Sequence, residues 1–176
     1  PHLVGERARA LDVLAAGGLV CASAVALAEA MPPPAVRPGR LDLSVGHEPG
    51  IEALEEHLAL AGYERVETVM EVGQWSVRGG IVDVYSPAHD RPVRAEFAGD
   101  EVESLRRFDP TSQRSADAVP ALEILPLGAR GAAAMLPAYL PARTLVVIGD
   151  RRAVEAPRDD APAADPLAEI LGGLQV

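Results

Sequence analysis

The chain has 176 residues, and the 48% that are hydrophobic can supply a folded core. Its formal net charge is −10, and all 16 basic residues are arginines. Because nucleic-acid affinity comes mainly from basic side chains that neutralise phosphates, this charge argues against direct binding of DNA or RNA. No apolar run approaches the roughly 20 residues that cross a bilayer, so no membrane association is expected.

The single cysteine, Cys21, excludes an internal disulfide. This usage favours a reducing compartment, and we expect the chain to be cytoplasmic. Since Cys21 lies in an apolar run and free cysteines usually pack as small hydrophobes, it is predicted to be buried.

The N-terminal part predicts a layered α/β unit. Residues 6–16 have the pattern of a helix that ends at two glycines, and residues 19–22 form a short apolar strand. Ser23 is a candidate N-cap for a second helix over 24–30, which three prolines stop. A strand is predicted over 41–45. This order of helix, strand and helix is typical of an α/β fold.

The central part predicts a helix followed by an antiparallel sheet. The helix covers residues 50–61, with its apolar side chains on one stripe and Gly62 as its stop. From residue 63 the hydrophobic period changes to two, which indicates strands that pack on this helix. The predicted strands cover 65–70, 75–78, 81–85, 93–97 and 102–108.

The C-terminal part predicts a return to the first layer. Residues 122–125 form a return strand, and residues 144–148 form a continuous apolar strand of the kind buried in parallel sheets. Residues 151–166 have no hydrophobic period and are predicted to be a linker. Residues 167–174 could form a helix of about two turns.

Catalytic and cofactor motifs are missing from the sequence. A phosphate-binding loop of the Walker A type needs a lysine, which the chain lacks, and Gly79-Gly80 lies between two strand patterns as a tight turn would. The four histidines are isolated, so neither a metal nor another cofactor is expected. The acidic stretch from Asp100 to Glu103 is predicted to be a solvated hairpin turn and not an acid–base site. We therefore expect no catalytic residue.

Four stretches carry a resemblance to a known family. They are Gly62–Val66, Gly73–Val84, Val93–Phe97 and Gly99–Arg106. In order, spacing and residue type they resemble the UvrB-homology region of the transcription-repair coupling factors (Mfd). The continuation from Phe108 to Ser115, which ends in Gln-Arg-Ser, resembles the coupling factors more than UvrB itself.

The resemblance implies a division of the chain. Residues 49–126 would be the inserted α+β antiparallel-sheet domain that interacts with UvrA. Residues 1–48 and 127–150 would belong to a flanking α/β domain, a degenerate UvrB-like domain without a phosphate loop. Residues 151–176 would be a linker or tail.

The resemblance also implies a function. In the family this inserted domain recruits UvrA to RNA polymerase stalled at damage, during nucleotide excision repair. The ATPase, polymerase-binding and DNA-translocation functions belong to other parts of the full protein. We therefore expect a non-catalytic interaction module whose partners are UvrA and other domains of its parent protein.

Two arginines of the family's UvrA-contact surface align with Arg78 and Arg94, which are the predicted partner-binding residues. An aromatic contact of the family aligns with Ala98, a departure from the pattern. Strand alternation places Arg94, Glu96 and Ala98 on the face opposite to the core. We therefore expect Arg94 to be exposed, and its charge reversal to leave the fold intact.

Two alternative functions remain open for this sequence. The same surface could dock on another domain of the parent protein and hold it in an inactive state. The chain could also be a small enzyme with an unrecognised site, which a deep pocket with converging Asp, Arg and His side chains would indicate.

Overall fold

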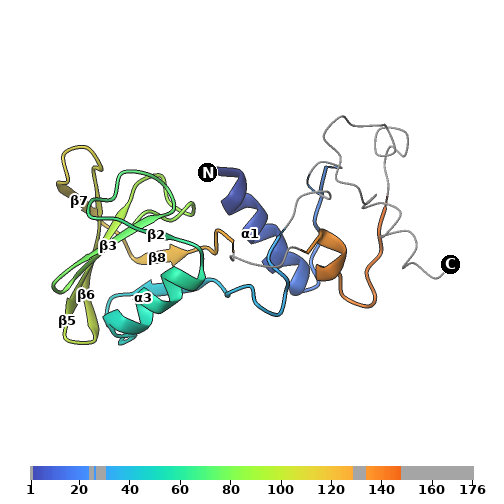
Figure 1. Cartoon of the computed structure of the whole chain (residues 1–176), viewed down its shortest axis with the longest axis horizontal. Helices are drawn as coiled ribbons and strands as arrows, with labels where there is room; N and C mark the ends of the chain where they lie inside the picture. Colours follow the sequence, from blue (N-terminus) through green and yellow to red (C-terminus); the bar gives the residue numbers. More distant parts are fainter. Residues whose placement is uncertain (1, 24–25, 27–30, 129–133, 148–176) are drawn as a thin grey trace. The chain divides into compact units, whose positions relative to one another are not determined.

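The computed structural model describes residues 2–23, 26, 31–128 and 134–147 (Figure 1). Its contacts divide into two compact units, one of residues 1–9 and 37–129 and the other of residues 10–36 and 130–176. Over the described ranges, no helix is both long and apolar enough to span a membrane.

The first unit contains most of the regular structure. Its elements after residue 37 are β1 (Leu41–Ser44), α3 (Ile51–Leu60), β2 (Glu64–Arg65), β3 (Gln74–Arg78), β4 (Ile81–Val84), β5 (Val93–Ala98), β6 (Glu101–Phe108), β7 (Ser115–Ala118) and β8 (Ala121–Ile124). Strands β2 to β7 form a six-stranded sheet in sequence order, and β1 pairs with β8 in a separate antiparallel sheet. The predicted antiparallel sheet is confirmed from β3 to β6. The contact of β6 with β7 is antiparallel as well, and the contact of β2 with β3 is parallel.

The core lies between α3 and one face of the six-stranded sheet, and β1 and β8 also contribute to it (Figure 1). The predicted apolar stripe of α3 is confirmed, since Leu54 and Leu58 are fully buried in this core. The sheet contributes alternate residues, for example Val82 and Val84 of β4. Burial of these side chains is the main force that holds the helix on the sheet.

The end of α3 requires glycine at position 62. Gly62 has φ 86°, a left-handed conformation that side chains rarely adopt, and it closes the helix as predicted. A Cβ atom added there would lie 2.4 Å from the carbonyl oxygen of Gly128. Conformation and close approach therefore both exclude a larger residue at this position.

Tight turns connect the central strands as predicted. Gly79-Gly80 joins β3 to β4, and Gly99-Asp100 joins β5 to β6. Next to the second turn the register shifts, because consecutive residues of β5 pair with Ser104 and Val102 of β6. Glu103 is the extra residue of this β-bulge, and the bulge keeps Val102 in the core while Glu103 stays exposed.

The strand predicted over residues 65–70 is shorter in the structure, where β2 ends at Arg65. The backbone N–H groups of Met70 and Glu71 both donate to the side-chain oxygen of Gln74, at 2.9 Å each. These N–H groups are occupied by a local turn and do not join a strand ladder. In addition, β7 was not predicted, because its four residues are all exposed and have no apolar alternation.

Helix α1 (His2–Ala15) confirms the first predicted helix and begins four residues earlier than expected. Its apolar residues Ala8, Leu11 and Leu14 are buried. The predicted second helix lies mostly outside the described residues, although the N–H of Ala26 donates to Ser23 Oγ at 3.3 Å, as an N-cap would require.

The strand predictions in the second unit are wrong for the described residues. Residues 19–22 form no strand, Leu19 is 91% exposed, and Cys21 is exposed rather than buried. Residues 144–147 form no strand either. A continuous apolar strand needs neighbouring strands, and over the described ranges neither segment has one.

The remaining features of the second unit were not predicted. Met31 and Ala134 form an isolated antiparallel bridge, and a short 3₁₀ helix η1 covers Leu136–Tyr139. The Tyr139 hydroxyl donates to the carbonyl of Pro32. The predicted linker over 151–166 and the helix over 167–174 lie outside the described residues.

Candidate partner-binding site

The site is built on the sheet face opposite to the core, where β4 and β5 place Asp83 directly beside Arg94. Arg94 binds this carboxylate with two nitrogens, Nε at 2.7 Å from Oδ1 and Nη2 at 2.9 Å from Oδ2. The Asp83 side chain is only 1% exposed. A buried carboxylate requires such a paired and hydrogen-bonded partner.

Arg94 is enclosed by further contacts. Its guanidinium carbon lies 4.7 Å from the centroid of the Phe108 ring, within the range of a cation–π contact. Nη1 donates to the Gln113 carbonyl and to Ser115 Oγ, at 3.4 Å each. Its hydrogen bond to Asp83 raises the pKa of Arg94 above its ordinary value. The side chain is 13% exposed, so the expectation of an exposed Arg94 was wrong.

Arg94 is mostly buried because the loop from Asp109 to Arg114 contacts the face on which it lies. Gln113 has a left-handed backbone, with φ 59°, and its side-chain nitrogen donates to the carbonyls of Val69 and Pro110. These bonds fix the loop beside the sheet. Strand alternation separates two faces but gives no information about what covers the outer one, so the burial could not be read from periodicity.

The loop is also stabilised at its start. The N–H of Ser112 donates to Asp109 Oδ1 at 2.7 Å, and this bond lowers the pKa of Asp109. Asp109 and Gln113 both belong to the stretch from Phe108 to Ser115, on which part of the resemblance noted above rests. In this chain the stretch forms the loop that contacts Arg94.

Arg78, the second predicted residue, lies at the end of β3 and is 49% exposed. Its Nη2 donates to Asp83 Oδ2 at 2.8 Å. The two predicted arginines therefore meet on a single carboxylate. Asp83 was missed, although the alternation of β4 shows it as the polar residue between two core valines, on the same face as Arg94.

The outer face becomes more open toward the turn between β5 and β6. Glu96 accepts a hydrogen bond of 2.7 Å from the Ser104 hydroxyl, and both side chains are partly buried. Ala98 lies beside this turn and is exposed, and Arg106, which pairs with Arg94 at the other end of β5, is exposed too. The open end of the face thus carries the half-exposed Arg78 and the small Ala98, at which the resemblance predicts an aromatic residue.

Two pockets lie elsewhere on this unit. One, of about 560 Å³, is formed at the start of α3 and is lined by Glu48, Pro49, Gly50, Ile51, Glu52, Ala53, Gly99 and Asp100. The other, of about 470 Å³, is lined by Glu52, Glu55, Glu56, Ala59, Tyr63, Arg65 and Trp75. Neither brings Asp, Arg and His together. Among the described residues, no group of three or more His, Cys, Asp or Glu could hold a metal ion.

Comparison with known proteins gives the family. The family model of the UvrB interaction domain matches residues 41–129, which include β1 to β8 and the two arginines. The transcription-repair-coupling factor of Myxococcus xanthus is 44% identical over 84 residues, which are 48% of this chain and 7% of that protein.

Longer matches include the flanking segments. The transcription-repair-coupling factor of Mycobacterium bovis is 33% identical over 171 residues, 90% of this chain and 13% of the relative. That of Bacillus subtilis is 34% identical over 129 residues, 72% of this chain and 11% of the relative. The chain thus spans about a tenth of the length of these relatives. It belongs to the UvrB interaction domain family, and its relatives are transcription-repair-coupling factors.

Proposed function

We propose that this chain is the UvrA-binding module of a bacterial transcription-repair coupling factor, and that it recruits UvrA to RNA polymerase stalled at DNA damage. The family match over β1 to β8 and the coupling-factor relatives support this proposal. The module itself would be non-catalytic, and the ATPase activity would belong to other parts of the parent protein in the cytoplasm.

One observation carries the proposal. Arg78 lies half-exposed on the outer sheet face, with its guanidinium held at 2.8 Å by a buried carboxylate. Arginine is favoured in protein interfaces because its planar fork can donate several hydrogen bonds while its stem packs against apolar surface. A guanidinium with a fixed orientation loses less side-chain entropy when a partner binds.

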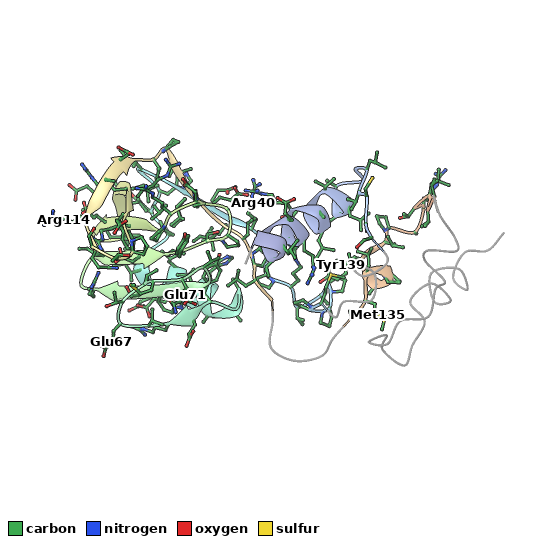
Figure 2. All side chains as sticks on the ribbon, turned by 90° about the horizontal axis from the view of Figure 1, so that it is seen from above. Arg40, Glu67, Glu71, Arg114, Met135 and Tyr139 are labelled. Carbon is green, nitrogen blue, oxygen red and sulfur yellow. The ribbon has the colours of Figure 1, made fainter. Side chains whose placement is uncertain are left out.

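The direct test is a calorimetric titration of the chain with UvrA. Arg78→Glu should weaken binding more than tenfold, because it removes the donor and adds a like charge against the partner's acceptor. Arg40→Glu is the matched control, since Arg40 is 50% exposed and also binds one aspartate closely, Asp42 at 2.7 Å. In Figure 2 Arg40 lies far from Arg114. Arg114 directly follows Gln113, whose carbonyl binds Arg94.

The control variant should bind UvrA like the parent chain. If Arg78→Glu also binds like the parent while both variants melt normally, the outer sheet face is not the recruiting surface. If the parent chain does not bind UvrA at all, the proposed function is wrong.

Two alternatives make different predictions. Docking of the same face on another domain of the parent protein would make the full-length protein bind UvrA more weakly than this chain does. An enzymatic role would require a pocket with converging Asp, Arg and His side chains, and neither of the pockets described above contains such a group. We therefore favour the interaction module.

A further inference from the structure

We propose that Asp83 is the positioning residue of the partner-binding surface, and that it gives the two arginines different roles. Arg94 would be the fixed anchor, and Arg78 the residue that meets the partner. This inference rests on the proposed function and assigns a role to a buried residue that the family motif did not indicate.

The geometry begins with one shared atom. Oδ2 of Asp83 accepts hydrogen bonds from Nη2 of Arg78 at 2.8 Å and from Nη2 of Arg94 at 2.9 Å. The two guanidinium groups are therefore neighbours on either side of a single negative charge. Asp83 is held in place by its position in the central strand β4, which pairs with β3 on one side and β5 on the other.

The attachments of the two arginines are unequal. Arg94 has a second bond to Asp83, contacts with Gln113 and Ser115, and the Phe108 ring beneath it. Within the described part of the chain, Arg78 has Asp83 as its one hydrogen-bond partner, and about half of its side chain is exposed. Loss of the Asp83 charge would thus leave Arg94 largely in place but release Arg78.

Electrostatic repulsion explains why Arg78 would be released. With Asp83 ionised, the cluster of three side chains carries a net charge of one positive unit. With a neutral residue at position 83, two adjacent guanidinium groups repel one another where solvent screens them poorly. Arg78 can relieve this repulsion because it is the more exposed of the two, and it would move away from its fixed orientation into solvent.

The surface would therefore present a guanidinium whose position is set by a residue that never touches the partner. Asp83 would thus support Arg78 from behind, because its buried charge holds the Arg78 guanidinium in the orientation that binding needs. It also leaves Arg78 free to share its remaining N–H donors with an acceptor of the partner, without breaking the bond to Asp83.

The test is a double-mutant cycle in UvrA binding, made with the full 176-residue chain. The variants are Asp83→Asn, Arg78→Ala and the double variant, and thermal melts check that each is folded. Asp83→Asn keeps the shape of the side chain and removes its charge. We expect it to weaken UvrA binding at least fivefold in the parent background, and less than about twofold when Arg78 is already alanine.

Additive losses in the cycle would show that Asp83 acts only through the fold, and would overturn the proposal. Unchanged or tighter binding by Asp83→Asn would overturn it as well. Absence of binding by the parent chain would instead reject the proposed function.

A measurement on the parent chain keeps the proposal testable if Asp83→Asn does not fold or UvrA does not bind. In nitrogen-15 NMR, the Arg78 guanidinium should show hindered rotation and slow exchange of its N–H protons with water, as an ion-paired group does. Arg106, an exposed arginine on β6, is the internal reference for free rotation. Rotation of Arg78 as fast as that of Arg106 would overturn the positioning role.

Discussion

Arg94 and Arg106 are directly paired across β5 and β6, yet Arg94 is mostly buried in an ion pair with Asp83 and Arg106 is exposed. Arg94→Glu should therefore lower the free energy of unfolding by about 3–5 kcal/mol, because it leaves the buried Asp83 with the half-exposed Arg78 as its remaining arginine and adds a second carboxylate beside it. Arg106→Glu should change it by about 0.5 kcal/mol, as exposed substitutions usually do. Urea unfolding followed by the fluorescence of Trp75, the only tryptophan, measures both values.

Equal stability of the two variants would contradict the ion pair between Arg94 and Asp83. The prediction also affects binding experiments, since weak UvrA binding by Arg94→Glu could result from unfolding alone. Arg78 is the more informative position for charge reversal, because its side chain is half-exposed.

Ala98 offers a gain-of-function prediction on the open part of the outer face, where its side chain is exposed opposite Glu101. Ala98→Phe introduces the aromatic residue that the resemblance predicts here, and burial of the ring against UvrA should contribute about 1.5–3 kcal/mol, tenfold or more in affinity. Titration with UvrA measures the change. If the folded variant binds no more tightly than the parent, this chain contacts its partner without an aromatic residue here.

Alanine substitutions at Gly62 and Gly99 distinguish the effect of backbone strain from that of steric overlap. Both have positive φ, but an added Cβ would lie 2.4 Å from the Gly128 carbonyl oxygen at position 62 and would contact nothing within 4 Å at position 99. Gly99→Ala should cost about 1 kcal/mol of stability from the left-handed backbone alone. Gly62→Ala should cost clearly more, and thermal melts of the two variants would show the difference.

If Gly62→Ala were no less stable than Gly99→Ala, the close approach of residue 62 to Gly128 would not exist in solution. The comparison needs no partner protein, and it tests the packing at the end of α3 directly.

His89 predicts a loss of stability in acid. Its Nε2 accepts a hydrogen bond from the N–H of Glu123 at 3.0 Å, so it must be unprotonated there, and burial lowers its pKa. Glu123 and Asp90 raise this pKa and Arg107 and Arg9 lower it, but the effect of burial is larger. The unfolded chain then binds the proton more readily, so the stabilisation is present above about pH 6.5 and is lost as the pH falls through the lower folded value.

The measurement is the change in urea midpoint between pH 7.5 and pH 5.0. His89→Gln should reduce this change, because its amide oxygen can accept the same bond and does not titrate. Burial also lowers the pKa of His57, but its buried Nε2 accepts no hydrogen bond from the described residues. His57→Gln is therefore the control for a buried histidine without this bond. An unaltered pH dependence in His89→Gln would show that this bond does not govern acid stability.

Periodicity predicted the central part of the fold well. Residues with a period of two gave β3 to β6, and the apolar stripe of residues 51–61 gave α3, because each of these elements has one face in the same core. The strands predicted over 19–22 and 144–148 rested on apolar composition without alternation. An apolar composition alone does not show which neighbouring strand would bury such a segment. The described residues of both segments form no strand.

For the candidate site, the sequence predicted which two arginines lie on it but not how they are held. The motif indicated Arg78 and Arg94, and alternation indicated their common face, but the shared carboxylate and the covering loop depend on contacts between residues far apart in sequence. Gln113, for example, reaches Val69 across 44 positions. Such contacts follow from the three-dimensional path of a loop, which hydrophobic spacing does not encode.

The pairing of β1 with β8 has a consequence for protein engineering. Leu41 and Ile124 are direct partners in this ladder, so the segment 41–124 begins and ends side by side. A segment whose two ends are adjacent can be placed within a surface loop of a host without stretching that host. Residues 41–124 should therefore be transplantable as a block, and a chimera carrying them could transfer recognition of the partner to an unrelated scaffold.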